Sequence, residues 1–65
     1  MSTANVIKIS AESLASFDDA IREGIKAASR TVRNIRGAWV KEQVVIDNAD
    51  STRFSVELKV TFVME

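Results

Sequence analysis

The sequence contains no cysteine, no histidine and no proline, and only two of its 65 residues are glycine. Without cysteine there is neither a disulfide nor a thiolate ligand, and without histidine the usual zinc sites are excluded, which leaves only hard cations held by carboxylates. A domain this small buries only about 60% of its unfolded surface and needs additional support. Because disulfides and zinc are excluded, we expect the chain to be stabilised by association with copies of itself.

An excess of one charge is also missing, since nine basic residues balance nine acidic ones. No strong electrostatic field draws the chain to nucleic acid or to an anionic membrane, so we expect neither as a partner. No apolar run approaches the roughly 18 residues of a membrane span, and residues 1–5 lack the basic and apolar parts of a signal peptide. We therefore expect a cytoplasmic protein in which residues 1–65 form a single domain.

The first half of the sequence combines a strand pattern with a helix pattern. Residues 6–11 alternate between apolar and polar side chains, which predicts a half-buried strand. Ser16, followed three positions later by Asp19, resembles a capping box and predicts a helix that starts at Phe17 and runs for about 17 residues. Gly24 is unfavourable inside a helix, so we expect it to allow close approach of a strand. The apolar stripe of the helix consists of Phe17, Ile21, Gly24, Ile25, Ala28 and Val32.

The second half of the sequence predicts two long strands, residues 35–46 and residues 52–64, because apolar side chains recur there with a period of two. The turn-forming residues 47–51 lie between them and predict an antiparallel hairpin. In the first of these strands, the face toward the helix is expected to carry Ala38, Val40, Val44 and Ile46, interrupted by Glu42. The opposite face is expected to carry Gly37, Trp39, Lys41, Gln43 and Val45.

These patterns together predict an α+β fold of β-α-β-β order, with a three-stranded antiparallel sheet wrapped around one helix. The helix covers only one face of such a sheet. The other face, with Trp39, Val45 and Val63, has no partner within the chain, so we expect a second subunit to supply the missing layer.

Three segments of the sequence are similar to the dodecin family: residues 16–22 (SFDDAIR), residues 27–35 (AASRTVRNI) and residues 56–62 (VELKVTF). The similarity extends over nearly the whole chain. It implies a homododecamer of tetrahedral symmetry that encloses a cavity and that binds or stores a small molecule. In the best-known members of the family this molecule is a flavin, held in stacked pairs at subunit contacts.

The resemblance also implies where a flavin would bind, and this chain departs from the family pattern there. The flavin-stacking tryptophan of the family corresponds to Gly37, and the nearest aromatic residue, Trp39, lies about 7 Å further along the strand. The flavin-bonding glutamine corresponds to Ser55, whose hydroxyl cannot provide the paired donor and acceptor of an amide. We therefore expect a degenerate site for FMN or riboflavin at Gly37, Trp39 and Ser55. The sequence resembles the branch without the flavin signature, part of which is associated with calcium.

Two interpretations of Trp39 stay open: its indole is either a stacking platform for a planar ligand or an anchor at a subunit interface. The alternative function is a non-flavin shell that binds ions such as calcium or has a purely structural role. The candidate oxygen ligands are Asp47, Asp50 and Glu65, although turn formation alone explains the two aspartates. Five basic residues could hold a phosphate, but solvation and pairing with other subunits explain them better: Arg22, Lys26, Arg30, Arg33 and Arg36.

Nothing in the sequence predicts an enzyme. There is no cysteine or histidine nucleophile–base pair and no glycine-rich phosphate loop. Ser55 and Lys59 alternate on an open strand without an oxyanion hole or a base-orienting partner, so a Ser-Lys dyad is not expected. The sequence thus predicts no catalytic residue and no metal site, and it favours a small-molecule binding or storage shell.

Overall fold

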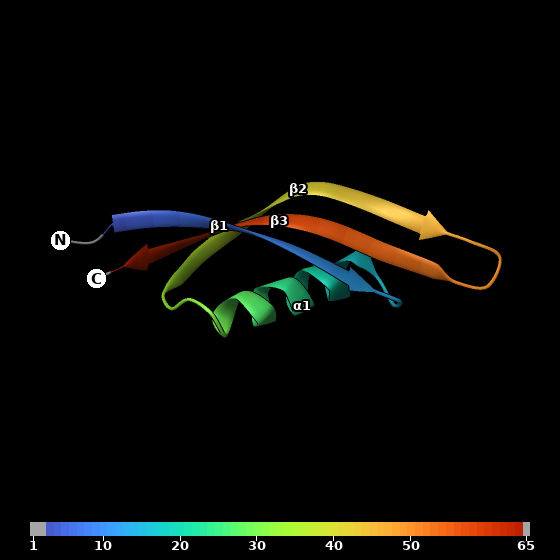
Figure 1. Ribbon diagram of the computed structural model, residues 1–65, viewed down its shortest axis with the longest axis horizontal. Coiled ribbons are helices and arrows are strands. Elements are labelled where there is room, and N and C mark those ends of the chain that lie inside the picture. The colour runs from blue at the N-terminus through green and yellow to red at the C-terminus, as the bar shows by residue number, and fades with distance from the viewer. Residues whose placement is uncertain (1–2, 65) are drawn as a thin grey trace.

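The computed structural model describes residues 3–64, which form β1 (Thr3–Ser13), α1 (Phe17–Ser29), β2 (Ile35–Asp47) and β3 (Thr52–Met64) (Figure 1). The three strands make one antiparallel sheet in the order β1-β3-β2, and α1 lies against one face of it. The predicted β-α-β-β fold is therefore confirmed. The shape is elongated, with extents of 52 × 18 × 14 Å.

The core lies between α1 and the central strand β3. Leu58 and Val60 are fully buried, as are Ala20 and Ala28 of α1. Strict alternation of apolar and polar residues in β3 explains this arrangement, because every second side chain points at the helix. Near the start of α1, Phe17 packs edge-to-face on another aromatic ring, that of Phe54, with the ring centroids 5.1 Å apart.

α1 begins as the sequence predicts. The Ser16 hydroxyl accepts a hydrogen bond from the Asp19 backbone N–H at 3.0 Å, which satisfies one of the unpaired donors of the first turn. A second hydroxyl supports the same turn, since the buried Ser13 donates to the Asp19 carboxylate at 2.6 Å and accepts from the Ala15 N–H at 2.9 Å. These contacts tie the end of β1 to the start of α1.

Gly24 allows the close approach of the sheet that the sequence predicts. A Cβ atom at this position would lie 2.6 Å from the Leu58 Cδ1 atom and 3.3 Å from the Ala11 Cβ atom. No side chain fits between α1 and the two strands here, so glycine is required for packing.

The predicted length of the helix was wrong, because α1 ends at Ser29 after 13 residues. The N–H groups of Arg30 and Thr31 bond to carbonyls three residues earlier, which tightens the last turn. Asn34 then adopts a left-handed conformation with φ of 59°, and this turns the chain into β2. Val32, predicted on the helix stripe, therefore lies in the connection between α1 and β2.

The predicted faces of β2 were correct only up to Val40, because a bulge at Lys41 shifts the register. Val40 pairs with Leu58, but Glu42 pairs with Glu57, so Lys41 has no partner position on β3. A bulge of one residue moves every later side chain to the opposite face. Glu42, Val44 and Ile46 therefore lie on the face away from α1, whereas Gln43 and Val45 lie on the same face as α1, contrary to prediction.

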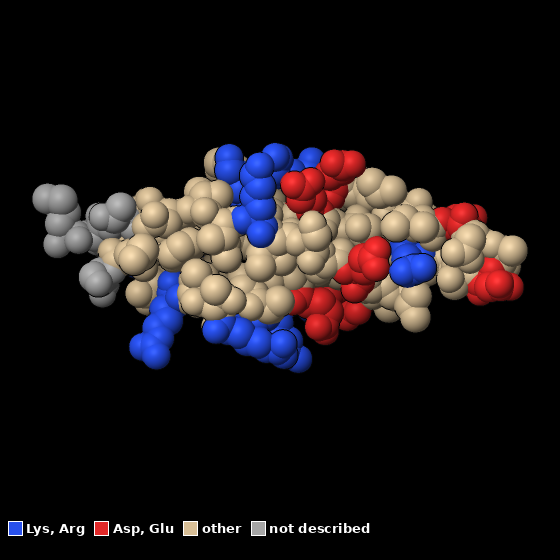
Figure 2. All heavy atoms as spheres, in the orientation of Figure 1, with Lys and Arg blue, Asp and Glu red and all other residues tan. Residues whose placement is uncertain are grey.

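The charges of the helix follow its dipole. Asp18 and Asp19 lie in the first turn and Lys26 lies in the last. In Figure 2 the acidic groups along the lower edge gather near the start of α1 and the basic groups near its end. Within residues 3–64, α1 is neither long nor apolar enough to cross a membrane.

Candidate functional site

The sheet face opposite α1, here called the outer face, has no covering layer in the chain. Its residues are identified from β3, where Val56, Leu58 and Val60 are buried against α1 and the alternate residues point the other way. The strand register arranges the outer face in four successive rows, each crossing β1, β3 and β2: Val6, Thr61, Gly37; then Lys8, Lys59, Trp39; then Ser10, Glu57, Glu42; and then Glu12, Ser55, Val44.

Trp39 is the largest side chain of the outer face, and 64% of it is exposed. The Lys59 ammonium nitrogen lies 5.5 Å from the centroid of its ring, in a cation–π contact. An exposed indole on an uncovered sheet face is a suitable surface for stacking a planar molecule or for packing against another subunit.

Gly37 is the neighbour of Trp39 on the outer face, and the backbone does not require glycine there. A Cβ atom would meet only the Thr61 hydroxyl oxygen, at an ordinary contact distance of 3.6 Å. That hydroxyl donates a hydrogen bond to the Gly37 carbonyl at 3.2 Å. The absence of a side chain at Gly37 thus leaves open space beside the Trp39 ring.

Ser55 lies on the outer face as well, but away from Trp39. It pairs with Glu12 on β1 and with Val44 on β2, two rows beyond the row of Trp39. Four residues separate Ser55 from Lys59 along β3, which corresponds to about 13 Å. A single chain therefore brings Gly37 and Trp39 together but leaves Ser55 apart. The same separation rules out a hydrogen-bonded pair of Ser55 and Lys59.

An acidic pair on the outer face was not predicted from the sequence. Glu42 and Glu57 lie directly opposite each other on β2 and β3 because of the bulge at Lys41. They line an open depression of about 160 Å³ together with Ser10, Val44, Ser55 and Val56. One sign of this pair is present in the sequence, because Glu42 interrupts the apolar face predicted for the strand. A bulge removes the conflict, since it moves the Glu42 carboxylate to the outer face.

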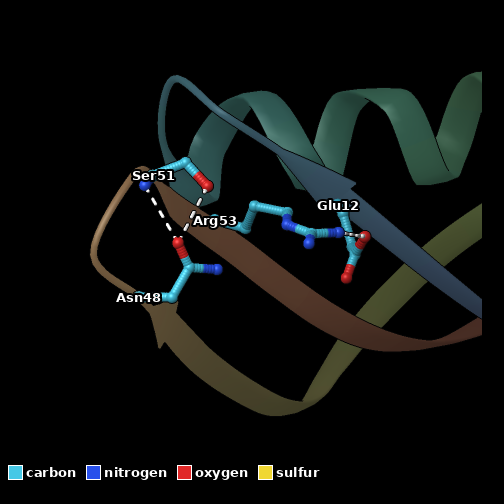
Figure 3. Close-up of polar contacts among 4 residues, drawn as sticks. All are labelled: Glu12, Asn48, Ser51 and Arg53. Carbon is cyan, nitrogen blue, oxygen red and sulfur yellow. Dashed lines mark hydrogen bonds and ion pairs between the residues drawn. The ribbon is translucent and has the colours of Figure 1, made fainter.

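The candidate calcium ligands Asp47 and Asp50 belong to the turn between β2 and β3. The Asp47 carboxylate accepts a hydrogen bond from the Thr52 hydroxyl at 2.9 Å, and the Asn48 side-chain oxygen accepts from the N–H groups of Asp50 and Ser51 at 3.1 and 3.0 Å. Figure 3 shows the contacts between Asn48 and Ser51 beside the ion pair of Glu12 with Arg53. The third candidate, Glu65, lies outside the described residues. Residues 3–64 contain no group of three acidic side chains placed to hold a metal ion.

The basic residues considered for phosphate binding lie in α1, in its connection to β2 and at the start of β2, and all five are exposed: Arg22, Lys26, Arg30, Arg33 and Arg36. In Figure 2 the basic groups lie mostly toward the end of the molecule with the termini, and the acidic groups toward the β2–β3 turn. The charges are therefore balanced in sum but segregated along the molecule.

Comparisons with known proteins agree on one family. The sequence profile of the dodecin family matches residues 3–65. Dodecin from Streptomyces davaonensis is similar at 32% identity with a TM-score of 0.90, covering 98% of this chain and 96% of that chain. The calcium-chelating immunodominant antigen calcium dodecin from Mycobacterium tuberculosis is 33% identical with a TM-score of 0.84, covering 97% of this chain and 91% of that one.

A protein from Thermus thermophilus, 21% identical over 100% of this chain and 97% of that chain, has the same fold with a TM-score of 0.91. The comparison with curated proteins gives no match.

Proposed function

The chain belongs to the dodecin family, and from that premise we propose that it assembles as a hollow homododecamer that binds and stores a planar, flavin-type ligand through a weakened site on the outer face. In this proposal residues 1–65 form one domain per subunit, the protein acts in the cytoplasm, and it has no catalytic activity. Gly37, Trp39 and Ser55 form the ligand site.

The surface of the single chain supports the assembly. It exposes 4709 Å², whereas a compact monomer of this mass exposes about 4,100 Å². Bulky apolar side chains account for part of the excess, and they lie mainly along β2 and at the ends of the sheet: Val6, Leu14, Trp39, Val40, Val44, Val45, Ile46 and Met64. The part of β2 that extends past α1 is uncovered on both faces of the sheet. Neighbouring subunits are therefore needed on each of these two faces.

One observation carries the proposal for the ligand: the exposed Trp39 ring lies on an uncovered face, next to the open space above Gly37. An indole stacks on any flat π surface, and isoalloxazine is one. The site is weakened because Gly37 offers no second ring. Stacking of a base on an aromatic side chain contributes roughly 1–3 kcal/mol, so a missing ring lowers affinity by about 5- to 150-fold. Ser55 in place of an amide lowers it further.

Two measurements test the proposal. Light scattering should give a mass of about 86 kDa, twelve times the 7.2 kDa of one chain. Titration with FMN and riboflavin should show weak quenching of flavin fluorescence, which Trp39→Ala abolishes. Glu23→Ala changes an exposed side chain of α1, on the other side of the sheet, and is the control, expected to leave the quenching unchanged.

The double variant Gly37→Trp with Ser55→Gln should strengthen flavin binding, because the open position at Gly37 accepts a Cβ atom without a clash. A monomeric or dimeric mass at micromolar concentration would contradict the assembly. Strong quenching that survives Trp39→Ala would contradict the ligand site, since Trp39 is the only tryptophan of the chain.

Calcium binding is the second candidate function, favoured by one observation: the similar protein from Mycobacterium tuberculosis is a calcium dodecin. Because residues 3–64 hold no group of three acidic side chains for a metal, a calcium site here would combine carboxylates from several subunits. Calorimetric titration of the assembled protein with calcium chloride distinguishes the two functions. Heat of binding with calcium and no quenching of flavin would favour the second.

A further inference from the structure

A pair of lysines lies beside Trp39 on the outer face. Lys8 on β1 and Lys59 on β3 are directly opposed, and Trp39 on β2 continues the same row. Directly opposed like charges destabilise a sheet. Within residues 3–64 no ion pair involves either lysine, so none of the described carboxylates neutralises the pair. Side chains that oppose the stability of a fold in this way are expected at functional sites.

Lys59 contacts the indole directly. Its ammonium nitrogen lies 5.5 Å from the centroid of the Trp39 ring, within the range of a cation–π interaction. A planar molecule that stacks on this face of the ring has to move the ammonium aside. For a neutral ligand the lost contact lowers affinity by about 2- to 5-fold, which corresponds to one exposed cation–π interaction. A ligand with an anionic group recovers the loss, because the displaced ammonium can then bind that group.

Lys8 is placed to bind the same anionic group. The Cβ atoms of directly opposed residues are about 4.5–5.5 Å apart, so both ammonium groups can contact one phosphate or carboxylate. Neighbouring strands lie about 4.8 Å apart. Lys59 is therefore one strand away from Trp39, and Lys8 is two strands away, at about 10 Å. The substituent of a ring that stacks on Trp39 has to cross only this distance.

The neighbouring rows decide on which side of the lysine pair an anionic group lies. Glu57 and Glu42 form the row on one side, about 7 Å away along β3, and they repel an anion. The row on the other side is uncharged and consists of Val6, Thr61 and Gly37. The open space at Gly37 lies on this side as well. The uncharged side is therefore the favourable one for the anionic group.

We infer that the outer face selects planar ligands that carry an anionic substituent such as a phosphate, with the ring on Trp39 and the anion bound by Lys8 and Lys59. Lys59 sets the selectivity, because its ammonium opposes a neutral ligand and attracts an anionic one. The inference rests on the flavin-type site of the proposed function. It adds the charge of the ligand and the side chains that recognise this charge.

FMN and riboflavin test the inference, because they share the ring and the ribityl chain and differ only by the phosphate. Titration by fluorescence quenching in low salt should give an affinity for FMN about 5-fold or more above that for riboflavin, and this ratio should fall as salt is added. Lys8→Met should weaken the binding of FMN alone, by about 2- to 5-fold. Lys59→Met should weaken FMN by a similar factor and strengthen riboflavin by about 2- to 5-fold.

Lys26→Met is the matched control, because it removes the same charge at an exposed position of α1, on the other side of the sheet. It should leave both affinities unchanged. Lys59→Arg keeps the charge and can still contact an aromatic ring, so the ratio should stay near that of the wild type. Glu57→Gln removes a repulsive carboxylate and should strengthen the binding of FMN alone. The salt dependence of the wild-type ratio keeps the test decisive if a lysine variant fails to fold, as judged by circular dichroism.

The inference is overturned if the wild type binds FMN and riboflavin equally, if the ratio survives both Lys8→Met and Lys59→Met, or if Lys26→Met lowers the ratio as much as they do. In each case, riboflavin binding that still depends on Trp39 would leave the proposed ligand site standing. A wild-type protein that binds neither flavin would instead refute the flavin-type site, and the inference with it.

Discussion

Replacing Gly24 with alanine should destabilise the protein, although alanine is the better helix former. The new Cβ atom would lie 2.6 Å from the Leu58 Cδ1 atom and 3.3 Å from the Ala11 Cβ atom. Contacts below 3.0 Å require movement, and Leu58 is fully buried. Admitting the new methyl group therefore requires the Leu58 side chain to repack in the core or the helix and the sheet to separate locally.

Two opposing terms set the magnitude. Alanine gains about 1 kcal/mol over glycine inside a helix, whereas inserting a methyl group into a packed core costs about 1–3 kcal/mol. Because the new atom is too close to both β3 and β1, we expect a value near the upper end of that cost. The free energy of unfolding should fall by about 1–2 kcal/mol. Urea denaturation at a fixed protein concentration measures it, since the proposed assembly would make stability depend on concentration.

Gly37→Ala is the matched control, because the same methyl group meets only the Thr61 hydroxyl oxygen at 3.6 Å. It should change the free energy of unfolding by less than about 1 kcal/mol, in the stabilising direction. A second test combines Gly24→Ala with Leu58→Val, which removes the crowded Cδ1 methyl group and should recover part of the loss. The packing argument fails if Gly24→Ala raises the urea midpoint, or if Leu58→Val costs the same in both backgrounds.

Three further changes test local features of the fold by urea denaturation. Ser13→Ala should lower the free energy of unfolding by about 1–2 kcal/mol, because the buried hydroxyl is bonded to Asp19 at 2.6 Å; an unchanged midpoint would contradict a structural role. Asn34→Val should cost about 1–2 kcal/mol and Asn34→Gly much less, because φ is 59°; equal costs would argue against the left-handed turn. Glu12 and Arg53 are half exposed and 3.6 Å apart, so a double-mutant cycle should give a coupling below about 1 kcal/mol that declines with salt.

The elements whose own residues show one clear pattern, such as strict alternation or a capping serine, were predicted well from the sequence. The third strand was expected at residues 52–64 and is β3 with these bounds. Its alternation is unbroken, and its central part packs against α1 through Val56, Leu58 and Val60. The cap at Ser16 and the close approach at Gly24 are also confirmed, since each depends on a residue type whose chemistry leaves few alternatives.

The register of β2 could not be predicted, because its sequence is consistent with two registers. Val44, Val45 and Ile46 are all apolar, so either alternate set could face the helix. Only the pairing of β2 with β3 places the bulge at Lys41. The end of α1 was also predicted wrongly, because the sequence there is consistent with two structures. Val32 continues the apolar period of the helix, whereas the left-handed conformation of Asn34 turns the chain into β2.

The candidate site was predicted in part. Gly37 and Trp39 lie together on the outer face, as expected, and Ser55 shares that face two rows away. The roles of these residues in binding stay a prediction. The acidic pair of Glu42 and Glu57 could not be predicted, because the two residues become neighbours only through the pairing of β2 with β3 after the bulge at Lys41.

β3 lies between β1 and β2 in the sheet, yet it follows both of them in the sequence. During synthesis, β1 and α1 are therefore made before the strand that pairs with β1. At about 5–20 residues per second, roughly 3 to 10 s pass between the completion of β1 and that of β3. The β2–β3 hairpin then forms within microseconds. β1 thus remains without its pairing partner, and α1 without the strand that buries most of its apolar stripe, until β3 has been made.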